Sequence, residues 1–454
     1  MDSWTFKYTS RGQQDYEECR TAGIWNARIP HRYPEVIAYP EKDEDVRIIV
    51  QYAAKHGFRI ATKSGGHSWS ASFLRDGGVL IDMCKMNDYS FDKDARTAEV
   101  QPGLHGAVLN HAVSASGLMF PVGHCPTVAL GGYLLQGGMG WNSRKWGFAC
   151  ESVTAIDLIN ADGDLIHASN TENTEFLWAA RGSGCGFFGV VTRFYLRLHP
   201  IPGGISSSRY VFEIADLDEV STALGAVSDQ IPACLEMITL IAHDQDGFLG
   251  RPTAVIAADA LAETPEEAKR ALDILHNIPV MSRSIKSYPF MECTIKEMFD
   301  KYEQLAVKGG RYEVNGVWVN APMETLLPRI HSIVNVLPPL PSHVYLSWWL
   351  PHQPRPDMAF SMEARYYISI NIIHEDPSRD ARYAKLPVDI LGSSQDYVQG
   401  TSLADENLAN DPGKFMSLHN YRRLEKLRRK HDPEGRFYGY PRLPLEFEQI
   451  RSSL

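Results

Sequence analysis

The chain has 454 residues, 44% of them hydrophobic and 22% charged, which is a globular composition and a length sufficient for two domains. A formal net charge of -10 argues against nucleic acid as the main partner, because binding phosphate requires a basic surface. Seven dispersed cysteines without a CxxC pair indicate no disulfide framework and no metal site, and the lack of a signal-like start or of a roughly 18-residue apolar run predicts a cytoplasmic protein with no membrane partner.

Residues 1–200 show mixed α and β patterns with short connections. Acidic residues at 41–45 favour a helix start, Gly57 favours its end, and a strand over 58–62 follows. Further along, the patterns predict strands over 79–83, 97–100, 153–160, 165–168 and 190–198, and helices over 105–116 and 172–181.

The pattern changes at the Pro- and Gly-rich segment 200–204, which is a plausible linker. Beyond it, a long helical pattern over 264–276 alternates with strand-like runs over 344–349 and 366–373. This alternation predicts a sheet covered by helices. A charged amphipathic helix over 418–431 is expected near the end of the chain.

The first motif that suggests chemistry follows the strand over 58–62 and has the sequence Lys63-Ser64-Gly65-Gly66-His67-Ser68. Two adjacent glycines let the backbone approach an anion closely, and successive amide N–H groups can hold a pyrophosphate. Taken alone, so short a stretch is more often a tight turn with a surface histidine.

The second motif spans 121–141 and contains two glycine pairs, at 131–132 and 137–138. Paired glycines favour neither helix nor strand, so we expect an irregular segment that wraps a flat, polar group with its backbone amides. Cys125 stands at the head of this segment. On its own, a free cysteine there is more often a small buried residue than a reactive one.

The third motif, 181–189, contains a literal GxGxxG at positions 184, 186 and 189. A dinucleotide-binding fingerprint of the Rossmann type must follow a strand and open a helix. Here a helical pattern precedes the glycines and a strand follows them, and no acidic residue lies about twenty positions on. We therefore reject the Rossmann interpretation.

In this order, and with a fourth match over 420–437, the motifs resemble the berberine-bridge-enzyme-like branch of the vanillyl-alcohol-oxidase superfamily, whose members are FAD-linked oxidases. The resemblance covers essentially the whole chain. It implies an α+β fold in which a PCMH-type FAD-binding domain of two α/β subdomains occupies 1–200. A substrate domain, an antiparallel sheet covered by helices, would occupy 201–400, and a C-terminal segment over 401–454 would return to the FAD domain.

The resemblance also implies that FAD is bonded twice, with His67 on the flavin 8α-methyl group and Cys125 on C6. Val128 falls where relatives gate the oxygen-reactive face of the flavin, and valine there goes with oxidases; the alternative is a simply packed aliphatic side chain. The remaining residues that the resemblance places against FAD are Thr62, Lys63, Ser64, Gly65, Gly66, Ser68, Gly123, Gly131, Gly132, Gly138, Trp141, Val190 and Asn420.

The catalytic base is not fixed by the resemblance. Many relatives carry Tyr-x-Asn-Tyr where this chain has Tyr397-Val398-Gln399-Gly400, so the usual second tyrosine is missing. On the strand over 366–373, alternation places Tyr367, Ser369 and Asn371 on one face and His374, just beyond its end, on the other. The candidates for the base are Tyr367, Tyr397, Asn371 and His374, and hydride loss without a strong base stays open.

The resemblance implies an oxidase that moves a hydride from a small, apolar or aromatic substrate of the secondary-metabolite type to flavin N5. The oxidised group would be an alcohol, an amine or an activated C–H bond, and O2 would reoxidise the flavin to give H2O2. The alternatives are a flavin dehydrogenase with another electron acceptor, a carbohydrate oxidase, and a non-catalytic flavin-binding protein. The expected partners are the substrate and O2.

Overall fold

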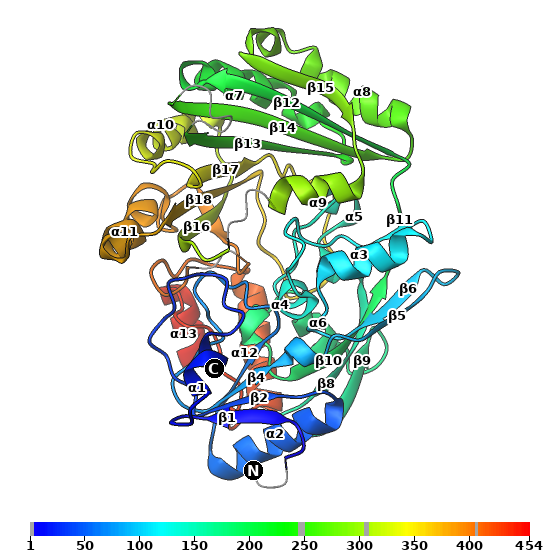
Figure 1. Ribbon diagram of the computed structural model, residues 1–454, viewed down its shortest axis with the longest axis vertical. Helices are drawn as coiled ribbons and strands as arrows, with labels where there is room; N and C mark the ends of the chain where they lie inside the picture. The colour runs from blue at the N-terminus through cyan, green and yellow to red at the C-terminus, as the bar shows by residue number, and fades with distance from the viewer. Residues whose placement is uncertain (1–3, 244–249, 304–307, 405–406) are drawn as a thin grey trace.

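The computed structural model describes residues 4–243, 250–303, 308–404 and 407–454. Figure 1 shows two halves stacked along the long axis: a large sheet with its helices above, and below it a part that contains both ends of the chain. Within these ranges, no helix combines the length and the apolar character needed to cross a membrane. The expected α+β fold is confirmed.

The lower half contains a small sheet that carries the first motif. Its strand order is β1-β2-β4-β3, with β2 and β3 parallel to β4 and β1 antiparallel to β2. Helix α2 covers it through Val46, Ile49, Val50 and Ala53, which are all buried, and Gly57 closes the helix with a φ of 67°. The bounds are β1 (Lys7–Ser10), α1 (Tyr16–Thr21), β2 (Val36–Tyr39), α2 (Asp43–His56), β3 (Ile60–Lys63) and β4 (Val79–Asp82).

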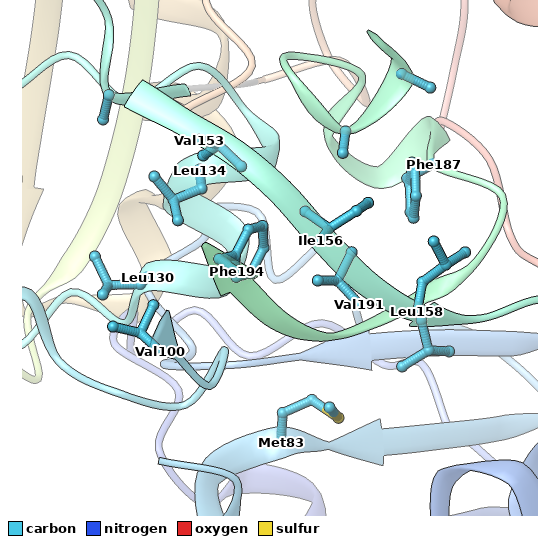
Figure 2. Packing of buried hydrophobic residues seen from close by; sticks show 14 of the residues in the cluster. Met83, Val100, Leu130, Leu134, Val153, Ile156, Leu158, Phe187, Val191 and Phe194 are labelled. Carbon is cyan, nitrogen blue, oxygen red and sulfur yellow. The ribbon is translucent and has the colours of Figure 1, made fainter. Parts of the chain in front are cut away.

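A second, antiparallel sheet of strand order β5-β6-β10-β8-β9 carries the third motif at the start of β10. Figure 2 shows its apolar side chains, among them Ile156, Val191 and Phe194, packed into the same core as Met83 and Leu134. The bounds are β5 (Tyr89–Asp92), β6 (Thr97–Val100), α3 (Gly106–Ser114), β8 (Val153–Ile159), β9 (Leu165–Ser169), α6 (Thr174–Ala180) and β10 (Val190–Arg197); a short ladder joins β7 (Leu118–Met119) to β11 (His199–Pro200).

The glycine-rich second motif is not irregular throughout, which corrects the expectation from sequence. It contains the short helix α4 (Leu130–Leu135), and a second short helix, α5 (Ser143–Trp146), follows it. Leu130 and Leu134 of α4 are fully buried in the core, and this tertiary packing outweighs the poor helix propensity of Gly131 and Gly132.

The upper half is built on one large sheet of strand order β15-β12-β14-β13-β17-β18-β16-β19. Its described strands pair antiparallel throughout, and helices α7, α8, α10 and α11 pack on its outer face around a second core. The bounds are β12 (Gly204–Glu213), α7 (Leu217–Val227), β13 (Leu235–His243), β14 (Pro252–Ala262), α8 (Pro265–His276), β15 (Lys286–Glu292), α9 (Ile295–Glu303), β16 (Arg311–Val319), α10 (Met323–Val334), β17 (His343–Ser347), β18 (Tyr366–His374), α11 (Asp380–Leu391) and β19 (Val398–Thr401).

The end of the chain returns to the lower half through α12 (Leu418–His431) and α13 (Leu445–Ser453). Phe437 forms a parallel bridge with Ile60, whose N–H donates to the Arg436 carbonyl at 2.7 Å and whose carbonyl accepts from the Tyr438 N–H at 2.9 Å. Residues 436–438 therefore extend the sheet beside β3. The domain boundaries at 200 and 400 stay a prediction.

Candidate active site

The three glycine-rich motifs meet around a cavity of about 360 Å³. It lies between the turn after β3, the head of the second motif with α4, and the loop that enters β10. The described residues of its wall include most of the positions expected to hold FAD: Thr62, Lys63, Ser64, Gly65, Gly66, His67, Ser68, Gly123, Cys125, Val128, Gly131, Gly132 and Val190.

A larger cavity of about 830 Å³ adjoins the first one and faces the inner side of the large sheet. Cys125, Trp69, Tyr133, Gln136 and Met139 line both cavities. A ring held at Cys125 would therefore lie where the glycine-lined space opens onto the sheet. This arrangement is that of a cofactor cleft beside a substrate chamber.

His67 is held in its neutral form. Its ring stacks on the indole of Trp25, with ring centroids 4.4 Å apart and planes inclined by 26°. Burial lowers the pKa of His67 from 6.5 to about 4, and the nearby His105 and Lys308 act in the same direction. At neutral pH its imidazole is unprotonated on one nitrogen and can act as a nucleophile.

His67 and Cys125 are joined by a residue that the sequence analysis did not single out. The hydroxyl of Thr127 lies 3.1 Å from Nε2 of His67 and 3.5 Å from Sγ of Cys125. The two predicted attachment residues, 58 positions apart in the sequence, thus lie within hydrogen-bonding distance of one hydroxyl group. Cys125 is partly exposed and has no disulfide partner.

Lys63 lines the cavity, but its charge is already compensated. Its ammonium lies 2.7 Å from the carboxylate of Asp82 on the neighbouring strand and donates to the Ala22 carbonyl at 2.6 Å. Both side chains are at most 4% exposed. The structure therefore gives Lys63 a part in fixing the strand that carries the Gly65-Gly66 turn.

The wall of the first cavity has room for a bulky group at one glycine in particular. A Cβ placed on Gly132 would meet no protein atom within 4 Å, although Gly132 lies in a helix and lines the cavity. At Gly131, by contrast, a Cβ would lie 2.3 Å from Oγ of Ser64, so that glycine lets the first and second motifs touch. The residues present thus fit a flat cofactor lying along α4.

Three of the predicted FAD residues lie elsewhere. Gly138 lines the larger cavity. Trp141 is fully buried and stands behind His124, whose ring centroid is 4.2 Å from its own. Asn420, in the first turn of α12, donates its side-chain amide to the carbonyls of Met358 and Ala359 at 2.8 and 3.2 Å. Neither Trp141 nor Asn420 is among the described residues lining the two cavities.

The polar face predicted for the strand over 366–373 faces the larger cavity. Tyr367, Ser369 and Asn371 of β18 line it, and the intervening Ile368 and Ile370 point into the second core. The hydroxyl of Tyr367 lies directly over Gly316, because a Cβ there would come within 1.9 Å of it. This face of β18 therefore offers a phenol, a hydroxyl and an amide to a substrate.

Tyr397 and His374 are not brought to this chamber. Tyr397 packs against the second core, and His374 lies 3.5 Å from Asp380 with its ring against Tyr383 of α11. Neither is among the described residues that line the larger cavity.

The chamber contains a histidine that the sequence analysis missed. His343, on β17 opposite Asn371, lies with Nδ1 2.9 Å from the Pro341 carbonyl. A carbonyl only accepts, so Nδ1 carries the proton. Burial lowers the pKa of His343, so the ring is neutral and Nε2 is the free acceptor nitrogen. Only its place in the sheet distinguishes it from the other histidines.

Comparison with known proteins agrees with this geometry. A family model described as an FAD binding domain matches residues 34–169. Over 441 residues, covering 95% of this chain and 96% of the relative, the sequence is 31% identical to the FAD-linked oxidoreductase nodO of Hypoxylon pulicicidum. The chain belongs to the FAD-linked oxidoreductases. The enzyme is thus an oxidoreductase, and its cofactor is FAD.

Solved structures share the fold of this oxidoreductase. The 6-hydroxy-D-nicotine oxidase of Arthrobacter nicotinovorans has a TM-score of 0.80 at 21% identity and covers 97% of this chain and 98% of its own. BBE-like 1 of Physcomitrella patens has a TM-score of 0.80 at 19% identity, with 97% of both chains covered. These neighbours confirm the fold expected for the berberine-bridge-enzyme-like branch.

A third neighbour exists in two forms. The grass pollen allergen Phl p 4, with glucose dehydrogenase activity, has a TM-score of 0.81 at 20% identity over 96% of both chains. A variant of it with isoleucine changed to valine is a glucose oxidase and has a TM-score of 0.80 at the same identity and coverage.

Proposed function

We propose that this oxidoreductase is an oxidase whose FAD is bonded to His67 and Cys125. It would oxidise a small apolar or aromatic molecule, with O2 as the electron acceptor. The observation that carries the proposal is the position of Cys125, which lines both the glycine-lined cleft and the chamber on the large sheet. When bound, FAD supplies the hydride acceptor and the group that reacts with oxygen.

Oxygen as the electron acceptor is supported by Val128. It lines the cofactor cleft at the position where the motif resemblance puts the oxygen gate. In Phl p 4, a change from isoleucine to valine separates a glucose dehydrogenase from a glucose oxidase. A side chain of this size leaves space for a diatomic molecule, and the product of oxygen reduction would be H2O2.

An apolar or aromatic substrate is supported by the wall of the chamber. Its sheet side is lined by aliphatic residues such as Val211, Leu240 and Val255. Among the described residues of this wall, no carboxylate occurs, and the guanidinium of Arg209 is paired with Asp259 at 2.9 and 3.2 Å. Phl p 4 oxidises glucose, but the aliphatic part of this wall could not hydrogen-bond the hydroxyl groups of a sugar.

The proton released from a substrate alcohol or amine needs an acceptor in the chamber. His343 is the best placed by its chemistry, because its tautomer is fixed with Nε2 as the free acceptor. Asn371, its neighbour across the strands, and Tyr367 are suited to hydrogen-bond the reacting oxygen or nitrogen. Tyr397 and His374 are too far behind the sheet for this role.

The decisive experiment asks whether the flavin stays with the chain. The wild type, His67→Ala, Cys125→Ala and the double variant are purified, precipitated in acid and separated on a denaturing gel. We expect yellow flavin absorbance to stay with the first three chains and not with the double variant, and the mass of one FAD to be added to each of those three. A wild type that releases all its flavin would contradict the double attachment.

The oxidase activity is tested separately with a compound panel. Apolar alcohols, cyclic amines and aromatic alkaloids are screened for H2O2 formation, with glucose and xylose oligomers as the carbohydrate comparison. A compound that bleaches the flavin without air but yields no peroxide in air would favour a dehydrogenase. If no compound bleaches it, the oxidase proposal fails in favour of a non-catalytic flavin protein. With a compound that bleaches the flavin of the wild type, His343→Gln should slow the bleaching at neutral pH.

A further inference from the structure

We propose that Thr127 is the positioning residue for attachment of the flavin. Its single hydroxyl hydrogen-bonds both His67 and Cys125 and so holds each in the form that reacts with the flavin. The proposal rests on the double attachment proposed above. Thr127 is exposed, and its hydroxyl lies 3.1 Å from Nε2 of His67 and 3.5 Å from Sγ of Cys125.

The backbone on both sides of Thr127 is fixed. The N–H of Val128 donates to the Cys125 carbonyl at 3.3 Å and closes a turn over 125–128. The Val128 carbonyl accepts from Gly106 at 3.0 Å, and the Pro126 carbonyl accepts from Ala107 at 3.4 Å, which ties the turn to the start of α3. The hydroxyl of Thr127 is thus presented by a rigid turn rather than by a loose loop.

A hydroxyl has one proton to donate and two lone pairs that accept. It can accept from the N–H of His67 and donate to the sulfur of Cys125 at the same time. This direction of bonding puts the imidazole proton on Nε2 and leaves Nδ1 as the nucleophilic nitrogen. It also stabilises the thiolate, which is the reactive form of Cys125. The low pKa of His67, which follows from burial, keeps the ring neutral for this arrangement.

Each of the two bond-forming steps is a two-electron oxidation, and O2 accepts the electrons. The bond from Nδ1 replaces one hydrogen of the 8α-methyl group, and the imidazole loses its Nε2 proton on the side of Thr127. The bond from sulfur replaces the hydrogen on C6, and the thiol proton is lost. Each bond releases two electrons and two protons, which reduce one O2 to H2O2.

The test uses two variants of one residue. Thr127→Val keeps the shape but removes the hydroxyl, and Thr127→Ser keeps the hydroxyl and loses the methyl group. Each is combined with Cys125→Ala, which isolates the histidine link, and with His67→Ala, which isolates the cysteine link. Flavin-free full-length protein, made in a riboflavin-starved host, is mixed with FAD in air, and the covalent fraction is followed over time by intact-chain mass.

We expect Thr127→Val to slow both links by about five- to tenfold, as for the loss of one ordinary hydrogen bond, and Thr127→Ser to restore them. In the His67→Ala background, Thr127→Val should also move the pH dependence of the cysteine link to higher pH, since the thiolate loses a donor. A purely structural role would not shift that profile.

The outcomes separate the two proposals. Unchanged rates of both links in Thr127→Val, with tight non-covalent FAD binding intact, would overturn the role of Thr127 and leave the attachment standing. A wild type that never forms a covalent link would overturn both. If Thr127→Val binds no FAD at all, Thr127→Ala takes its place, because a smaller side chain at this exposed position cannot clash.

Discussion

Lys63 and Asp82 face each other across the parallel strands β3 and β4, with Nζ and Oδ2 2.7 Å apart and both side chains buried. The pair stands directly before the turn that carries Gly65, Gly66 and His67. The charge of Lys63 is therefore neutralised within the protein, and we expect a pyrophosphate at this turn to be bound by backbone N–H groups. The pair fixes the position of those groups.

Removing one member of the Lys63–Asp82 ion pair should destabilise the folded protein. Lys63→Met leaves the carboxylate of Asp82 buried and unpaired, and we expect a loss of about 3–5 kcal/mol in the free energy of unfolding. Urea denaturation of the flavin-free protein measures it. Lys145→Met, which removes an exposed ion pair with Glu263, is the matched control and should cost less than about 1 kcal/mol. Equal effects of the two changes would show that burial does not matter here.

Filling the cofactor cleft should abolish FAD binding without unfolding the protein. Gly132→Leu places a side chain where no protein atom lies within 4 Å of the new Cβ, in the space expected for the flavin. Gly225→Leu is the matched control, since Gly225 also lies in a helix with nothing within 4 Å of a Cβ. We expect a colourless, folded Gly132→Leu protein and a yellow control, compared by absorbance and circular dichroism.

The size of the side chain at position 128 should set the oxygen reactivity. Val128→Ile adds one methylene group to the wall of the cofactor cleft. After reduction with dithionite, we expect the variant to reoxidise in air at least about tenfold more slowly, which corresponds to roughly 1.4 kcal/mol in barrier. Stopped-flow absorbance measures the rate without any substrate. Similar rates would indicate that Val128 is merely packed.

The stability of the protein should fall between pH 6.5 and 4. Burial lowers the pKa of His199 to about 4, with its ring stacked on Trp146 and Nε2 2.9 Å from the Ser152 hydroxyl. The unfolded chain takes up this proton near pH 6.5 and the folded chain only near 4, so the stabilisation is complete above 6.5 and is lost as the pH falls.

The size of the pH effect is at most about 3 kcal/mol for this one histidine. In His199→Gln the slope of unfolding free energy against pH over this window should decrease. Because burial also lowers the pKa of His67 to about 4, part of the slope should remain in His199→Gln, and a slope equal to that of the wild type would contradict the role of His199.

The sequence predicted the parts of the site that depend on local pattern. Alternation along 366–374 was enough to place Tyr367 and Asn371 on the chamber side of β18, and the glycine motifs converge as expected. It could not predict that α4 forms despite Gly131 and Gly132, because burial of its leucines supplies the missing stability.

Residues that act through long-range contacts were out of reach. Thr127 matters only because folding brings His67 beside it, and His343 only because β17 pairs with β18. Nothing in the local sequence shows that Asp82 would neutralise Lys63. Asn420 matched a family motif, yet its amide is used to hold Met358 and Ala359.

The strand-like segment 436–438 sets an order of events during synthesis. Phe437 and Tyr438 line the cofactor cleft, and their neighbours complete the edge beside Ile60, nearly the whole length of the chain earlier. A growing polypeptide therefore has an open cleft until its final stretch has left the ribosome. We therefore expect a chain that ends before this segment to bind no flavin and to be colourless.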